Sequence, residues 1–145
     1  MDFFIRLRVA LTELDPSHPM IVHFPIALTG AAFLFILIAH WKKNPALEQA
    51  AFFNIVLAAI STIVASITGY IDNINNYVGE APNALTKIFL AIALFILTTG
   101  ISIIRYRNPE IFTKGNRALY ITAYGISFFI AIVLAFLGGV ILYGF

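Results

Sequence analysis

Four long apolar runs dominate this chain, and charged side chains within them are absent or confined to their ends. The runs cover residues 20–41, 50–71, 84–105 and 117–143. As helices rising about 1.5 Å per residue, all four are long enough to cross a hydrocarbon core of about 30 Å. The sequence therefore predicts an all-α integral membrane protein, a four-helix bundle that leaves little chain outside the bilayer.

Composition excludes a soluble alternative. Of the 145 residues, 61% are hydrophobic and 11% are charged, whereas soluble domains carry roughly 25% charged residues. A soluble fold of this size could not cover so much apolar surface. The connections between the runs are too short for a second domain, so residues 17–145 are expected to form one four-span domain.

The first sixteen residues have a different pattern. On a helical wheel, apolar side chains share one face and polar ones the other; the apolar set is Phe3, Phe4, Leu7, Ala10, Leu11 and Leu14. This pattern predicts an amphipathic helix at the membrane surface over residues 1–16, serving as an interfacial anchor or as a docking element for a partner. No small-residue cleavage site follows, so a removable signal peptide is not expected.

Positive charge is distributed unevenly between the connections. Six of the nine Lys and Arg lie between runs one and two or between runs three and four: Lys42, Lys43, Arg105, Arg107, Lys114 and Arg117. Because cytoplasmic loops retain positive charge, these loops are predicted to be cytoplasmic. Both termini are then extracytoplasmic. The net charge of +2 is too small and scattered to indicate nucleic-acid binding.

Small residues recur at every fourth position on two of the runs. The second run has Ser61, Ala65 and Gly69, and the fourth has Ser127, Ala131, Ala135 and Gly139. Small residues let helix backbones approach closely in lipid. These positions are predicted helix-packing sites, either inside the bundle or against another subunit or a second copy.

Histidines are the candidate ligand residues. His23 shares a helical stripe with Ala27, Gly30 and Ala31, which predicts that its ring points into the bundle. Pro25 would leave the carbonyl of Ile21 without its helical donor beside this ring. Two roles stay open for His23: a cofactor ligand or proton carrier, and a structural hydrogen bond. His18 precedes Pro19 at the expected start of the helix and is the second ligand candidate.

These histidines limit the cofactors that the chain can hold. A haem in a membrane bundle commonly has two axial histidines from different helices, and this chain offers none outside the first span and its ends. One axial bond from His23 to a b-type haem or chlorophyll remains open. No cysteine is present, and the spacing of His18, His23 and Asp72 matches no specific metal motif, so no metal site is predicted.

Three segments carry a resemblance to a known family. The segment His18-Pro-Met-Ile-Val-His-Phe-Pro-Ile-Ala-Leu28, the Thr68-Gly69-Tyr-Ile-Asp72 segment and the Gly138-Gly139…Tyr143-Gly144 ending resemble motifs of a family of small bacterial membrane proteins of unknown function. The resemblance implies the four-span topology and a location in a bacterial inner (cytoplasmic) membrane. Relatives often carry histidines near the start of the third span and in the C-terminal glycine motif, which invites a haem or metal function; here Asn83, Lys87 and Phe145 lie in those regions.

The functional expectation follows partly by exclusion. The sequence contains no phosphate-binding glycine loop, zinc-protease helix or nucleophile elbow, so an enzyme is not expected. The prediction is an accessory or scaffold subunit of a larger membrane complex, respiratory or photosynthetic, in contact with lipid and other subunits. Alternatives are a tetrapyrrole-binding electron-transfer or pigment protein that uses His23, and a small transporter or proton pathway.

Overall fold

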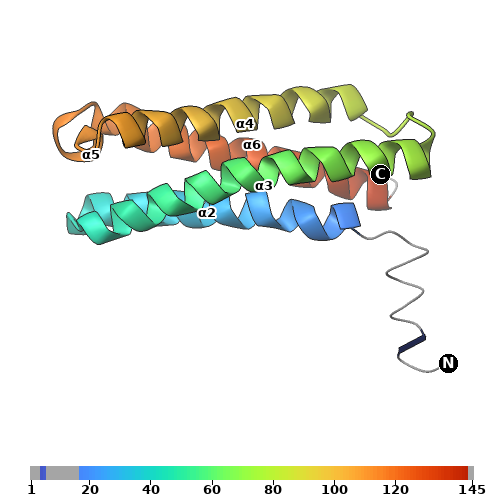
Figure 1. Ribbon diagram of the computed structural model, residues 1–145, viewed down its shortest axis with the longest axis horizontal. Helices are drawn as coiled ribbons and strands as arrows, with labels where there is room; N and C mark the ends of the chain where they lie inside the picture. Colours follow the sequence, from blue (N-terminus) through green and yellow to red (C-terminus); the bar gives the residue numbers. More distant parts are fainter. Residues whose placement is uncertain (1–3, 6–16, 144–145) are drawn as a thin grey trace.

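The computed structural model describes residues 4–5 and 17–143, and the described chain is an all-α four-helix bundle (Figure 1). Its long helices are α2 (Ser17–Lys42), α3 (Pro45–Tyr77), α4 (Ala84–Arg107) and α6 (Arg117–Tyr143), and α5 (Ile111–Lys114) is a single turn in the last connection. The predicted fold class is confirmed. The amphipathic helix predicted over residues 1–16 lies outside the described residues, apart from Phe4 and Ile5.

Successive helices run in opposite directions and form a square in cross-section. The extensive contacts are α2 with α3, α3 with α4, α4 with α6, and α6 with α2. The α2–α3 connection and α5 lie at one end of the bundle, which we call the loop end. The start of α2, the end of α3, the start of α4 and the end of α6 lie at the other end, the terminal end (Figure 1).

Helix α3 is longer than its apolar run. It begins at Pro45, an amino acid favoured at the first helical position, and the Asn44 side chain accepts a 2.9 Å hydrogen bond from the Ala46 amide. It ends where Val78 adopts a left-handed conformation with φ of 52°. The Asn73 side chain then accepts a hydrogen bond from the Ala81 amide. The helix therefore starts five residues before, and ends six residues after, the predicted span 50–71.

Buried residues on each helix alternate in spacings of three and four. They are Pro25, Thr29, Ala32, Ile36 and Ala39 on α2; Glu48, Ala51, Ile55, Ala58, Thr62 and Ala65 on α3, where Ala59 is buried beside this series; Leu94, Thr98 and Ile101 on α4; and Tyr120, Tyr124, Ser127 and Ala131 on α6. This spacing keeps one narrow stripe of each helix facing its neighbours, as in left-handed bundles.

Four buried Ser and Thr hydroxyls inside the bundle are satisfied within their own helices. Thr29, Thr62, Thr98 and Ser127 are each at most 3% exposed. Each donates to the carbonyl four residues earlier, at 2.7 to 2.9 Å. Since lipid cannot supply hydrogen bonds, this arrangement lets small polar side chains occupy the interior.

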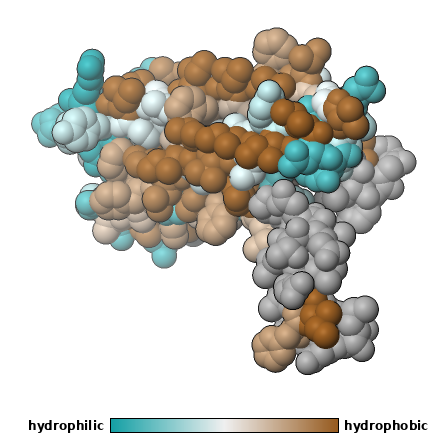
Figure 2. Space-filling view, turned by 45° about the vertical axis from the view of Figure 1, so that its right-hand side comes forward, coloured by the Kyte–Doolittle hydropathy of each residue, from teal (hydrophilic) through white to brown (hydrophobic). Residues whose placement is uncertain are grey.

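The outer surface fits a bilayer. Figure 2 shows an apolar band along the helices with hydrophilic residues gathered toward the ends. All four long helices are long and apolar enough to cross a membrane. These four helices are therefore the membrane spans of the bundle.

Candidate functional site

An ion pair lies inside the bundle at the loop end. Arg105, in the last turn of α4, donates from Nε to Glu48 Oε1 at 2.6 Å and from Nη2 to Glu48 Oε2 at 2.8 Å. The side chains are 17% and 5% exposed, respectively. Two parallel bonds of this kind fix the guanidinium and the carboxylate in one plane, so the pair joins α3 to α4 rigidly.

Two tyrosines extend this cluster into the bundle. Tyr120 donates its hydroxyl to Glu48 Oε1 at 3.1 Å, and the hydroxyls of Tyr120 and Tyr124 are 3.0 Å apart. The two rings pack edge to face, with centroids 5.1 Å apart, and the Arg105 guanidinium lies 5.5 Å from the centroid of Phe52. The cluster therefore connects α3, α4 and α6, and its charges are paired within the chain.

Sequence reasoning did not find this cluster. Glu48 lies two residues before the predicted second span, 50–71, and it is therefore not among the residues predicted to lie in the bundle. A signal was present: Glu48 shares the three-four spacing with Ala51, Ile55 and Ala58. An acidic residue continuing a buried stripe predicts a cationic partner at the same level.

His18 is held against α3 at the terminal end. Its Nδ1 lies 3.2 Å from Thr68 Oγ1. The Thr68 hydroxyl donates to the carbonyls of Val64 and Ala65, each at 3.1 Å, and its oxygen can accept a hydrogen bond from His18 Nδ1 when that nitrogen is protonated. A Cβ at Gly69 would lie 2.7 Å from His18 Cε1, so only glycine allows the ring to lie here.

Charged groups of two helices surround this half-buried imidazole. Asp72 of α3 and Lys87 of α4 both interact electrostatically with His18, and Asp72 accepts a 2.7 Å bond from Asn76. Over residues 4–5 and 17–143, no group of three His, Cys, Asp or Glu side chains could hold a metal ion. The geometry suits a proton or a single-bond ligand better than a multidentate metal site.

His23 does not point into the bundle. Its side chain is exposed, and its Nδ1 donates to the carbonyl of Pro19, one turn earlier, at 2.6 Å. The expectation of an inward ring beside the Ile21 carbonyl is therefore wrong. The buried stripe of α2 passes through Pro25 and Thr29, which turns His23 to the outside. Its role as a cofactor ligand stays a prediction.

The small residues proposed for packing occupy different environments. Ser127 and Ala131 are at most 1% exposed, and Ala65 is 8% exposed. Ser61, Gly69 and Gly139 are partly buried, whereas Ala135 is exposed. On α6 the row leaves the interior after Ala131, whereas on α3 the buried Ala65 lies between the partly buried Ser61 and Gly69.

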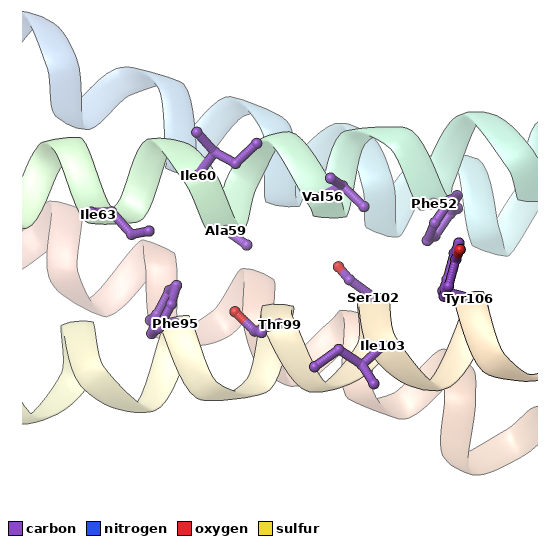
Figure 3. Close-up of a pocket in the computed structure, with 10 residues that line it drawn as sticks. All are labelled: Phe52, Val56, Ala59, Ile60, Ile63, Phe95, Thr99, Ser102, Ile103 and Tyr106. Carbon is purple, nitrogen blue, oxygen red and sulfur yellow. The ribbon is translucent and has the colours of Figure 1, made fainter.

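Two apolar grooves lie between neighbouring helices on the outside of the bundle. The α3/α4 groove has a volume of about 450 Å³, and its lining includes Ala59, Thr99 and Ser102 between larger side chains (Figure 3). The α2/α6 groove, of about 390 Å³, is lined by Phe33, Leu37, Ile121, Thr122, Gly125, Ile126 and Phe129. Since α3/α4 and α2/α6 are opposite sides of the square, the grooves face away from each other.

Each groove contains a hydroxyl without a hydrogen bond. Thr99 Oγ1 is buried and unpartnered, the sole such side-chain atom in the described part of the chain. Figure 3 shows the oxygens of Thr99 and Ser102 turned toward the space between α3 and α4; Ser102 donates to the Thr98 carbonyl. Thr122, in the other groove, is exposed.

Comparison with known proteins identifies the family. A family model described as "Predicted membrane protein (DUF2231)" matches residues 14–145. The chain belongs to this family. No curated protein and no solved structure matches the chain.

The segments that resemble motifs of the DUF2231 family lie together at the terminal end of the bundle. The three segments that carry the resemblance, around His18, Thr68–Asp72 and Gly138–Gly139, are far apart in sequence. They lie at the start of α2, near the end of α3 and near the end of α6, and the fold brings these to one end of the bundle (Figure 1). His18 contacts the second segment directly.

Proposed function

We propose that this protein is a non-catalytic accessory or scaffold subunit of a larger membrane assembly, and that it receives a transmembrane helix of a partner subunit in the α3/α4 groove. The observation that carries the proposal is the unpartnered Thr99 hydroxyl in a groove that is otherwise apolar.

The pattern of hydroxyl bonding supports a protein occupant. Between Thr29 and Ser127, the Ser and Thr side chains of the four spans donate to carbonyls of their own helices, with three exceptions: Thr86, Thr99 and Thr122. Thr86 is exposed in the first turn of α4, where water or headgroups can reach it. The other two exceptions line the two grooves.

A lipid acyl chain cannot satisfy such a hydroxyl, whereas a partner helix can. An unpaired polar group in an apolar environment costs roughly 1–3 kcal/mol, judged from protein mutations. Ala59, Thr99 and Ser102 have small side chains, so the groove is deeper where they line it. This permits a partner helix to approach closely. A carbonyl or polar side chain of the partner would accept the Thr99 proton after rotation of its side chain.

Two grooves on opposite faces favour a scaffold function, in which the chain lies between two partner helices, over a position at the edge of the assembly. A helix in the α3/α4 groove and another in the α2/α6 groove would lie on either side of the rigid bundle, so one chain would hold two neighbours at a fixed separation. Both grooves lie at the level of the spans, as a membrane partner requires.

The test is recovery of the native assembly in mild detergent. We expect Ala59→Phe, which fills the α3/α4 groove, to release the partner, and Thr99→Val to weaken its retention by about fivefold, as expected for one lost hydrogen bond of roughly 1 kcal/mol. Leu57→Phe is the matched control, because Leu57 is 52% exposed on α3 outside the groove. Purification of the wild-type chain with lipid alone, or as a second copy alone, would overturn the proposal.

A tetrapyrrole at the surface of this chain is a second candidate function. His23 donates Nδ1–H to a carbonyl and its side chain is exposed, which leaves Nε2 available outward, as in histidines that bind metal centres. One axial bond from His23 would suit a haem or chlorophyll held between this chain and a partner. A Soret or chlorophyll band in the purified assembly that His23→Ala removes and His40→Ala retains would support it; an assembly without a chromophore would refute it.

A further inference from the structure

The loop end of the bundle carries cations that the protein does not use internally. Lys42 is the last residue of α2, Lys43 follows it in the turn, and Arg107 is the last residue of α4. All three are exposed, and none has an ion pair or hydrogen bond with another described residue. Arg117, by contrast, donates to the Phe112 carbonyl at 2.8 Å and lies 5.2 Å from the centroid of the Phe112 ring.

The carboxylates at this end are already paired. Glu48 is bound by Arg105 within the bundle, and Glu110 by Lys114 at 2.9 Å. Lys42, Lys43 and Arg107 therefore leave an uncompensated positive surface on the described part of this end. The opposite end differs, because Asp72 and Glu80 lie there with Lys87.

Backbone geometry holds these cations in place. Lys43 has a φ of 52°, and the Asn44 amide donates to the Ala39 carbonyl at 3.1 Å, which is the closing bond of a left-handed helix cap. Asn108 donates similarly to the Ile104 carbonyl, directly after Arg107. The positive side chains therefore extend from helix ends whose backbone is fixed by hydrogen bonds.

Large exposed aromatics set the depth of this surface. Trp41 is 81% exposed beside Lys42, and Tyr106 is 80% exposed beside Arg107. Exposed Trp and Tyr at the ends of spans lie at the level of lipid headgroups. The adjacent cations therefore lie level with the phosphates of the membrane.

We propose that the cations of the loop end, Lys42 and Lys43 at the corner of α2 and Arg107 at the diagonal corner of α4, bind the headgroups of anionic phospholipids. Their place beside interfacial aromatics favours a lipid surface over an acidic segment of another protein, which would approach from the aqueous side. Each Lys or Arg near an anionic surface adds attraction that salt screens within about 10 Å at 0.1 M ionic strength.

The experiment compares lipids on the full chain. The purified protein is reconstituted in nanodiscs of phosphatidylcholine with or without 30% phosphatidylglycerol, and lipids retained after extraction are counted by native mass spectrometry. We expect phosphatidylglycerol to be retained with a preference of at least about tenfold at low salt. The preference should fall sharply in 0.5 M salt.

Variants separate this surface from other charges. The triple variant Lys42→Gln/Lys43→Gln/Arg107→Gln should lose the preference while its helical circular dichroism is unchanged, because no described intramolecular bond is removed. Lys87→Gln, at the other end, is the matched control and should keep it. An absent preference in the wild type, a preference surviving in the triple variant, an equal loss in Lys87→Gln, or equal competition by soluble glycerol phosphate would each overturn the proposal.

Discussion

Replacing Arg105 by Met should destabilise the bundle strongly. The change keeps most of the side-chain volume but leaves the Glu48 carboxylate, 5% exposed, with the Tyr120 hydroxyl as its remaining hydrogen-bond partner. Removing one member of a buried ion pair typically costs 3–5 kcal/mol. Because Arg105 itself is 17% exposed, we expect the lower end of this range, about 3 kcal/mol.

Reversible unfolding in mixed micelles measures this cost. The control is Lys114→Met: the Lys114–Glu110 pair is exposed and spaced i,i+4, so its loss should cost no more than about 0.5 kcal/mol. The double variant Glu48→Leu/Arg105→Met should be more stable than Arg105→Met alone, since it removes the unpaired charge as well. Equal losses for Arg105→Met and Lys114→Met, or additive losses in the double variant, would refute the reasoning.

Three further predictions concern packing and topology. Gly69→Ala should lower the unfolding midpoint by forcing His18 away from Thr68, at a cost of about 1–3 kcal/mol. In a His18→Ala background, Gly69→Ala should leave the unfolding midpoint unchanged in the same thermal assay. Ala131→Leu should cost a similar 1–3 kcal/mol, whereas Ala135→Leu, on the exposed side of α6, should be tolerated; equal unfolding midpoints would contradict the observed burial. A reporter fused at Phe145 should read extracytoplasmic and one fused in α5 cytoplasmic, and the reverse pattern would show that the predicted orientation is wrong.

The spans were predictable because length and missing charge are sufficient to identify a membrane helix. The ends were less so. Pro45 and Asn44 are recognisable start signals for α3, yet a search for apolar runs passes over them, and the polar turns from Asp72 to Tyr77 belong to the same helix. Hydropathy identifies the segment of a helix that lies in lipid, whereas capping residues identify where the helix begins and ends.

The rotation of each helix was harder to predict than its position. In lipid, both faces of a span are apolar, so a stripe of small residues near His23 did not identify the inner face. The inner face follows the three-four spacing through Thr29, Ala32 and Ile36, which requires comparing buried faces of several helices. Contacts such as His18 with Gly69, or Glu48 with Arg105, depend on that rotation and on which helices are neighbours, and neither is encoded in one segment alone.

The length of α3 determines how the protein meets bilayers of different thickness. Its 33 residues span about 50 Å at 1.5 Å per residue, well beyond a core of about 30 Å. Packing along α2 prevents α3 from tilting by itself. At the loop end, the transition to charge is abrupt, at Trp41 and Lys42, whereas beyond Thr68 exposed Ile71 and Ile74 alternate with polar residues. The loop end therefore has a fixed position at one membrane face, whereas the change from apolar to polar residues at the other face is gradual. A thicker or thinner bilayer then covers more or fewer turns of α3, and the packing of the bundle stays the same.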